Sequence, residues 1–273
     1  MSTPAAGVGT VVVTGITATE RADGTDQLAV EAPLEIRVNG RGYAVTMRTP
    51  GDDADLAAGF LVSEGVVGSA ADLTDVLVPA DATGDVVDAQ VAGPGALVAM
   101  DRHRHVYTTS SCGVCGLASI EAVATTSRFD PGVDPVRVDA RVLAALPARL
   151  RAAQALFDAT GGVHAAGLLT SAGDPVVVRE DVGRHNAVDK VVGWALRHGT
   201  LPAAGHVLQV SGRASFELVQ KAGMAGIPVL AAVSAPSSLA VELAEALGIT
   251  VVGFSRGTSM NVYARGDRVV GHL

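Results

Sequence analysis

The second half of the chain alternates short apolar runs with amphipathic segments, and this alternation constrains the fold more than any other feature. The runs with strand character lie at 163–170, 175–180, 206–210, 228–233 and 250–254. Helical spacing follows at 184–198, 214–222 and 237–247, and Gly248 marks the end of the last helix. Strands joined through helices usually pair in parallel, so we expect a layered α/β fold with crossover helices.

The first part of the chain has the pattern of an α+β unit. Strands are expected at 27–38 and 43–47, joined by a hairpin turn at Asn39-Gly40, with a short helix at 51–64. Further short strands are expected within 72–100, and helices at 117–126 and at 139–158, the latter interrupted or kinked at Pro147. We therefore predict a flexible N-terminal extension (1–26), an α+β domain (27–130) and an α/β domain (131–273), with a linker near 129–135.

Composition excludes several classes of protein. Hydrophobic residues make up 48% of the 273, which predicts a globular chain and not a disordered one. A net charge of −8 and only 3% aromatic residues argue against a nucleic-acid binder, which needs basic surfaces and stacking platforms. No run reaches the roughly 20 apolar residues of a membrane helix. No secretory signal is visible, so we expect a cytoplasmic protein in a reducing compartment.

The only two cysteines, Cys112 and Cys115, stand in the sequence Ser-Cys-Gly-Val-Cys-Gly at 111–116. Four interpretations are open: half of a zinc site, a dithiol redox pair, a thiolate or persulfide carrier, or an inert buried pair. No second CxxC is present, and the spacing to His103 and His105 matches no standard zinc finger. A redox pair normally follows a strand at a helix start, whereas this pair follows a polar loop. A carrier needs an exposed thiol of low pKa, favoured by a helix N-terminus and nearby cations such as Arg102 and Arg104.

A second constellation is the run EDVGRHNAVDK at 180–190, whose charges are concentrated in a chain that has few. It lies where a strand is expected to end and a helix to begin, which is where open α/β sheets bind ligands and helix N-termini attract anions. The simpler interpretation is a capped surface helix supported by an Asn186–Lys190 pair.

Two further turns combine arginine with small polar residues after a strand. They are Val-Ser-Gly-Arg-Ala-Ser at 210–215 and Phe-Ser-Arg-Gly-Thr-Ser at 254–259. The turn at 161–164 adds His164, which by itself is weak evidence for a site. An acidic protein with cationic turns at strand ends is expected to bind an anionic small molecule, most simply a phosphorylated one.

Four segments resemble the FdhD/NarQ family of formate dehydrogenase accessory proteins, in order and at family-like spacing. They are SSCGVCG at 110–116, TGGVHAA at 160–166, EDVGRHNAVDK at 180–190 and VSGRASFE at 210–217. The stretch KAGMAGIPV at 221–229 is similar as well. The resemblance extends from about Pro33 to the C-terminus.

The resemblance implies a function as a sulfur carrier. Such proteins accept persulfide sulfur from a cysteine desulfurase and pass it to the molybdenum cofactor, a bis(molybdopterin guanine dinucleotide). This precedes insertion of the cofactor into formate dehydrogenase, which needs it for activity. The persulfide cysteine of the family falls on Cys112, with Cys115 as a second sulfur handler.

The resemblance also implies a binding segment, a fold and an assembly. The second domain is expected to be similar to cytidine deaminases, and the protein to be a homodimer without a permanently bound metal. The segment that binds the cofactor falls on six residues: Phe254, Ser255, Arg256, Gly257, Thr258 and Ser259. As a hypothesis separate from the family motif, Arg184, Arg213 and Arg256 contact the pyrophosphates, with Arg179 as a further candidate.

An alternative from another class is a non-catalytic chaperone that binds the molybdenum cofactor and docks it to the dehydrogenase. A zinc deaminase is rejected, because such enzymes need a His-x-Glu motif and a Pro-Cys-x-x-Cys motif. The chain has no His-x-Glu, and Ser111 precedes Cys112.

Overall fold

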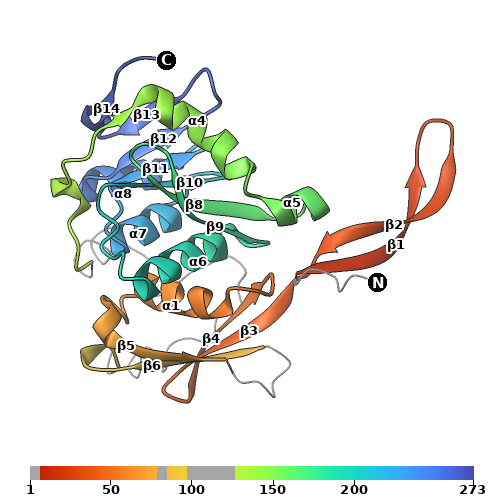
Figure 1. Ribbon diagram of the computed structural model, residues 1–273, viewed down its shortest axis with the longest axis horizontal. Helices are drawn as coiled ribbons and strands as arrows, with labels where there is room; N and C mark the ends of the chain where they lie inside the picture. The colour runs from red at the N-terminus through yellow and green to blue at the C-terminus, as the bar shows by residue number, and fades with distance from the viewer. Residues whose placement is uncertain (1–6, 79–84, 97–126) are drawn as a thin grey trace.

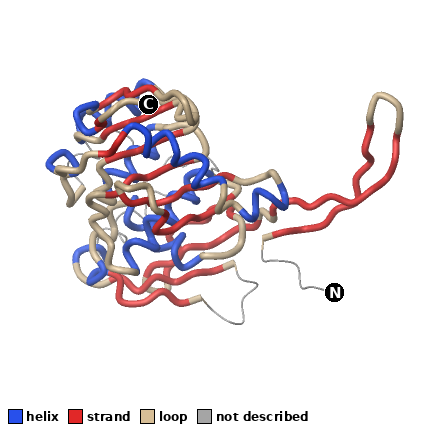
Figure 2. The backbone as a smooth tube through the Cα atoms, turned by 45° about the horizontal axis from the view of Figure 1, so that its top comes forward, coloured by secondary structure: helices blue, strands red, loops and turns tan. Residues whose placement is uncertain are grey.

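A computed structural model describes residues 7–78, 85–96 and 127–273. The loop with Cys112 and Cys115, the cationic run at 101–105 and the helix expected at 117–126 lie outside the described residues. Within them, the protein is a mixed α/β structure whose main body consists of stacked layers, with a long hairpin projecting from it (Figures 1 and 2). The α/β class predicted from the sequence is confirmed. The likeness to cytidine deaminases stays a prediction.

A six-stranded sheet forms the centre of the body, in the order β13-β12-β11-β10-β8-β9. Its strands are β8 (His164–Thr170), β9 (Pro175–Asp181), β10 (His206–Val210), β11 (Val229–Ala232), β12 (Thr250–Gly253) and β13 (Asn261–Ala264). The middle strands are buried on both faces, which explains their almost continuous apolar sequence.

The strand directions correct part of the expectation. The strands β10, β11 and β12 are parallel and connected through helices, as predicted. The pairs β8–β10, β8–β9 and β12–β13 are antiparallel, so only the middle of the sheet has crossover connections. The strands β8 and β9 are joined by the short turn around Gly173, which has no room for a crossover helix.

Helices cover both faces of this sheet (Figure 1). One face carries α4 (Ala140–Arg151), followed by the short α5 (Ala155–Thr160). The other face carries α6 (Arg184–Arg197), α7 (Phe216–Met224) and α8 (Ser238–Leu247). Gly248 ends α8 with a left-handed backbone, as its sequence position predicts. Pro147 lies inside α4, and the chain leaves the helix only after Arg151, so the interruption expected at Pro147 is wrong.

A second, four-stranded sheet has the order β4-β3-β6-β5. Its strands are β3 (Ala32–Val38), β4 (Arg41–Arg48), β5 (Leu73–Leu77) and β6 (Val86–Val91). Asn39 and Gly40 both have positive φ and join β3 to β4, which confirms the predicted hairpin turn. The helix α1 (Asp53–Ser63) packs between this sheet and the helices of the larger one (Figure 1). Two short strands, β7 (Val138–Asp139) and β14 (Val269–Val270), pair elsewhere.

The N-terminal region forms an arm that was not expected. The strands β1 (Val8–Ile16) and β2 (Arg21–Ala29) pair in a regular antiparallel hairpin that extends away from the body (Figure 1). The sequence predicted a flexible extension over 1–26, and most of that range is instead β structure. The strand expected over 27–38 is also divided, because β2 ends at Ala29 and β3 begins at Ala32.

No helix within the described residues is both long and apolar enough to cross a membrane.

Candidate functional site

Five loops meet at one edge of the six-stranded sheet. The parallel strands β10, β11 and β12 end there, and β8 begins there because it runs antiparallel to β10. The strand β9 also ends at this edge, since it is antiparallel to β8. The loops are 161–164, 182–183, 211–215, 233–237 and 254–260. The topology therefore brings the predicted Arg184, Arg213 and 254–259 to a single edge, as expected for ligand sites of open sheets.

Arg184 begins α6 at this edge and sits beside two histidines. His185 is buried, and its Nε2 has no hydrogen-bond partner among the described residues, lying 3.8 Å from Oε2 of Glu217. Burial, followed by the charges of Lys221 and Arg184, lowers the pKa of His185 to about 4. Burial and the Arg184 charge also lower the pKa of His164. Both rings are therefore neutral at pH 7.

Glu217, in the first turn of α7, completes this cluster. Burial on its own raises the pKa of Glu217, but its own backbone N–H and the nearby Ser215 hydroxyl lower it, helped by His185 and Arg184, so the pKa lies below its usual value. An ionised carboxylate thus stands near the Arg184 cation. His164 is close enough to Gly212 that a Cβ there would lie 3.6 Å from the imidazole Nδ1, so the two turns are in contact.

Most of the charged run at 180–190 has a structural role. Lys190 Nζ lies 2.8 Å from Oδ2 of Asp181, and both side chains are buried. The same Lys190 Nζ donates to the Thr49 carbonyl oxygen at 2.9 Å, and Asn186 Nδ2 donates to the Met47 carbonyl oxygen at 2.7 Å. The simpler interpretation of an exposed helix with an Asn186–Lys190 pair is wrong, because both residues are buried against β4.

A second buried pair lies further along α6. Lys221 Nζ of α7 lies 2.8 Å from both carboxylate oxygens of Asp189, which also accepts from Ser63 Oγ of α1 at 2.7 Å. Burial raises the pKa of Asp189, while Lys221 and Ser63 act in the opposite direction. The carboxylate therefore connects three helices. Of the long motif, Arg184 and His185 remain closest to the candidate site.

The segment 254–259 is a tight turn after β12. Arg256 N–H donates to the Ser259 carbonyl oxygen at 3.0 Å, and the Arg256 guanidinium lies 5.7 Å from the centre of the Phe254 ring. Ser255 is buried, and its hydroxyl donates to the Leu143 carbonyl oxygen of α4. The exposed members 256–259 are therefore the ones positioned to meet a ligand.

Two other predicted arginines differ in their surroundings. Arg213 is exposed on the turn after β10, where its charge faces solvent. Arg179 instead forms an ion pair with Asp55 of α1 at 2.9 Å and a longer one with Asp52. This pair holds the two sheets together, so the structure removes Arg179 from the candidate ligand contacts.

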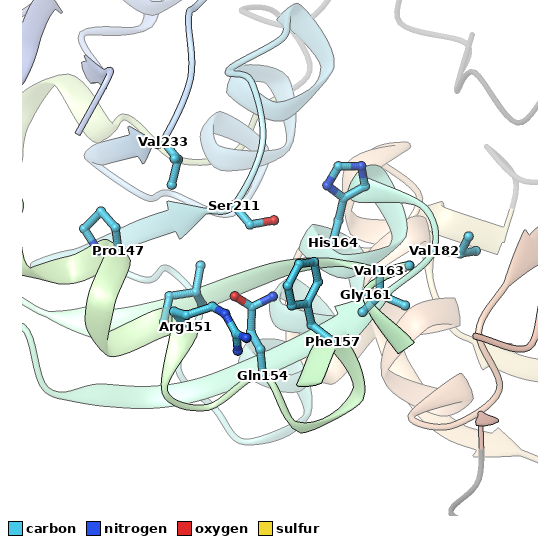
Figure 3. Close-up of a pocket in the computed structure, with 12 residues that line it drawn as sticks. Pro147, Arg151, Gln154, Phe157, Gly161, Val163, His164, Val182, Ser211 and Val233 are labelled. Carbon is cyan, nitrogen blue, oxygen red and sulfur yellow. The ribbon is translucent and has the colours of Figure 1, made fainter. Parts of the chain in front are cut away.

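A cavity of about 620 Å³ opens at the same edge, on the side covered by α4 and α5 (Figure 3). Its lining comes from Pro147, Leu150, Arg151, Gln154, Phe157, Gly161, Gly162, Val163, His164, Val182, Ser211 and Val233. The sequence motifs contained only Gly161, Gly162, Val163, His164, Val182 and Ser211 of these. The residues from α4 and α5 were missed because they have ordinary helix spacing. In the described part of the chain, no three His, Cys, Asp or Glu side chains gather as a metal site.

A sequence model of the FdhD/NarQ family matches residues 29–270, which is most of the chain. The chain belongs to the FdhD/NarQ family. The match begins at residue 29, the last residue of β2, so almost all of the projecting hairpin precedes the part shared with the family model. Within the match lie the strand-end loops, the cavity and the cysteine pair, which itself is outside the described residues.

Individual relatives agree with this membership. The chain is 61% identical to the sulfur carrier protein FdhD of Streptomyces avermitilis over 251 residues, covering 89% of each chain. It is 55% identical to the sulfur carrier protein FdhD of Mycolicibacterium paratuberculosis, covering 94% of this chain and 97% of that one. A crystal structure of a candidate formate dehydrogenase accessory protein from Desulfotalea psychrophila has the same fold, with a TM-score of 0.77 and 25% identity. That alignment covers 96% of this chain and 99% of the other.

Proposed function

We propose that this protein is a sulfur carrier that serves formate dehydrogenase. The observation that carries the proposal is the 61% identity to a sulfur carrier protein FdhD over 89% of both chains. The chemistry available to the chain agrees with it, because the only two thiols stand three residues apart between glycines. Thiolates are the nucleophiles that accept and release sulfur.

The sulfur arrives from a cysteine desulfurase in the proposed reaction. The Cys112 thiolate attacks the outer sulfur of the donor's persulfide, forming a Cys112 persulfide and releasing the donor's cysteine thiolate. This exchange needs no external electrons, because one sulfur–sulfur bond forms as another breaks. A thiolate of moderately low pKa favours it.

Delivery to the metal requires sulfur at the sulfide level. The Cys115 thiolate attacks the inner sulfur of the Cys112 persulfide, releasing sulfide to the molybdenum and leaving a Cys112–Cys115 disulfide. The two thiols thus supply the two electrons, and a thiol reductant restores them. Sulfide is a soft ligand well suited to such a metal.

The substrate that accepts the sulfur is, in this proposal, the bis(molybdopterin guanine dinucleotide) form of the molybdenum cofactor. Its phosphates need cations that are free to make charge-assisted hydrogen bonds. Arg213 and Arg256 are exposed on two loops of one sheet edge, after β10 and β12, and Arg184 begins α6 at the same edge. This arrangement supports binding of the cofactor at that edge.

A labelled-sulfur experiment tests the proposal. The protein is incubated with a cysteine desulfurase and ³⁵S-cysteine, and protein-bound label and activation of apo-formate dehydrogenase are measured. We expect Cys112→Ala to abolish both. Cys115→Ala should keep the label and lose activation at least tenfold, because the persulfide is not resolved.

The matched control is Ser111→Ala, which changes the neighbouring residue without removing a thiol and should behave as wild type. If neither cysteine variant lowers bound sulfur or activation, the carrier function is refuted. If both cysteine variants still activate the dehydrogenase, the result favours a chaperone that only binds the cofactor and docks it.

A further inference from the structure

The part of the chain that carries both cysteines begins and ends at one turn of the described structure. This part, the thiol segment, comprises residues 97–126 and lies outside the described residues. The turn comprises residues 66–72, between α1 and β5 (Figure 1). Residues 92–95 before the thiol segment and Arg128 after it both contact this turn. Described residues therefore bring the two ends of the thiol segment together.

The Asp72 carboxylate is the centre of this junction. Its Oδ2 accepts from the Gly68 N–H at 3.0 Å, from the Ser69 N–H at 2.9 Å and from the Ser69 hydroxyl at 3.1 Å. Nη1 of Arg128 donates to the same oxygen at 2.8 Å. Burial on its own raises the pKa of Asp72, but the Gly68 N–H and the Arg128 charge lower it, and the pKa lies below its usual value. The carboxylate is therefore ionised at pH 7 and holds Arg128 by a charge-assisted hydrogen bond.

The chain before the thiol segment is attached to the same turn through its backbone. The Ala92 N–H donates to the Asp72 carbonyl oxygen at 2.9 Å. A Cβ on Gly95 would overlap the Val66 carbonyl oxygen, so the backbones of these two residues are in contact. Asp72 thus holds the incoming chain with its backbone carbonyl and the outgoing chain with its side chain.

The outgoing chain is also tied to the helices of the larger sheet. The Ser127 hydroxyl donates to the Gly223 carbonyl oxygen in the last turn of α7 at 3.1 Å. The other end of α7 begins at Phe216, just after the loop that carries Arg213. A helix of nine residues is about 14 Å long, so the ends of the thiol segment lie away from the strand-end loops.

We propose that Asp72 is a positioning residue for sulfur delivery, because it joins the two ends of the thiol segment at a fixed point of the body. This inference rests on the proposed function, in which Cys112 delivers the sulfur. Cys112 lies 16 residues after Ala96 and 15 before Ser127, and an extended chain of 15 residues spans about 50 Å. Cys112 can therefore reach the strand-end loops while both ends stay fixed. Fixed ends confine the sulfur to a smaller volume and so raise its local concentration at an acceptor bound on the body.

A single-turnover delivery assay tests the inference on the full-length protein. The protein is first loaded with labelled sulfur by a desulfurase, and the rate of activation of apo-formate dehydrogenase is then divided by the bound label. Arg128→Gln should lower this rate at least about threefold and leave the bound label unchanged, because loading needs only an accessible thiol. Gly68→Ala should act in the same way, because its Cβ would displace the Arg128 side chain without removing a charge. The backbone of Gly68 lies outside the left-handed region, so alanine is tolerated there. Arg128→Lys keeps a cation near Asp72 and should recover at least half of the wild-type rate.

Two outcomes of these variants would contradict the positioning role. One is unchanged delivery per bound label in both Arg128→Gln and Gly68→Ala. The other is a rate for Arg128→Lys no higher than that for Arg128→Gln, because the ion pair would then not be the cause.

Arg37→Gln is the matched control. Arg37 pairs with Glu35 on β3 at 2.9 Å, and its side chain is partly exposed, as that of Arg128 is. This variant should deliver sulfur as wild type, and an equal loss in it would also overturn the inference. Thermal melts establish that all variants are folded at the assay temperature. Failure of the proposed function gives a different result, because Cys112→Ala would then still bind sulfur, whereas the positioning variants are compared per bound label.

Discussion

At the scale of single residues, buried charged side chains connect segments that lie far apart in the sequence. The Asp181 carboxylate accepts from Lys190 Nζ, from the backbone N–H groups of Thr49 and Gly183, and from Asn186 Nδ2. Charged groups are almost never buried without such partners. The concentration of charge at 180–190 predicted a special role correctly, but most of that role is to join β4 to α6 and not to bind a ligand.

His185 predicts how stability depends on pH. Its pKa is about 4 in the folded protein because of burial, then Lys221 and Arg184, against about 6.5 in an unfolded chain. As pH falls, the unfolded chain binds the proton first. The contribution of the buried neutral His185 to the free energy of unfolding is therefore full above pH 6.5. It is lost as the pH falls from 6.5 to 4, by up to about 3 kcal/mol.

Urea unfolding at pH 7.5, 6, 5 and 4.5 measures this effect. His185→Gln should lose less stability than wild type between pH 6.5 and 4, because glutamine does not titrate. Asp189 and the cations around the ring are present in both proteins, so their contributions cancel in the comparison, and the difference reports His185 together with its coupling to Glu217 and His164. Parallel pH curves for the two proteins would show that His185 does not titrate in this way.

At the scale of elements, α1 and α6 cross with their backbones in contact and so join the two halves of the chain. A Cβ on Gly59 would overlap the carbonyl oxygen of Asp189, and one on Gly193 would overlap the carbonyl oxygen of Asp55. The two helix backbones therefore touch. Glycine is required at both positions for this approach, although it lowers helix propensity.

Gly59→Ala is expected to destabilise the protein by at least about 3 kcal/mol, since overpacking against backbone cannot be relieved by a side-chain rotation. The direction is informative, because alanine in a helix normally stabilises by about 1 kcal/mol relative to glycine. Denaturant unfolding measures the change. Gly24→Ala in the hairpin is the control, because nothing lies within 4 Å of its added Cβ, and it should be near neutral.

The hairpin arm and the antiparallel strands show the limit of sequence patterns at this scale. The strands β1 and β2 are mostly exposed, so no face of theirs is buried and no alternation marks them. The periodic spacing of apolar residues predicts a strand or helix only when one face of that element is buried. For the same reason, the helices α6, α7 and α8, which bury one face, were predicted within two residues at each end, whereas the short edge strand β13 was not.

At the scale of the whole molecule, one hydrophobic core crosses the expected domain boundary. It includes Leu61 and Val62 of α1, Val188 and Val191 of α6, and Leu208 of β10. The pairs Asp181–Lys190 and Asp55–Arg179 add ionic contacts along the same interface. The two sheets are therefore expected to unfold together.

Native-state hydrogen exchange tests this cooperativity. The slowest amides of β3 and of β10 should exchange with free energies that agree within about 1 kcal/mol, because both require global unfolding. A difference above about 2 kcal/mol, with β3 opening first, would show that the smaller sheet unfolds as a separate domain.

The candidate site was only partly predictable. Arg213, Arg256 and the glycine turns follow strands in the sequence, and the general rule for open sheets placed them at one edge. Gln154 and Phe157 could not be found in this way, because they face the cavity only through the path of the chain between α4 and α5. Arg179 resembled a ligand contact until the structure placed it beside Asp55.

The sequence by itself determined the α/β class, the Asn39-Gly40 hairpin, most helix boundaries and the family, because these depend on local spacing or on continuous motifs. Tertiary structure decided which charges are paired in the interior, which strands run antiparallel, and which side chains surround the cavity. The physical reason is that burial and pairing depend on residues far apart in the chain, such as Met47 with Asn186 or Ser63 with Asp189. A pattern within a short stretch of sequence does not show which distant residues come into contact.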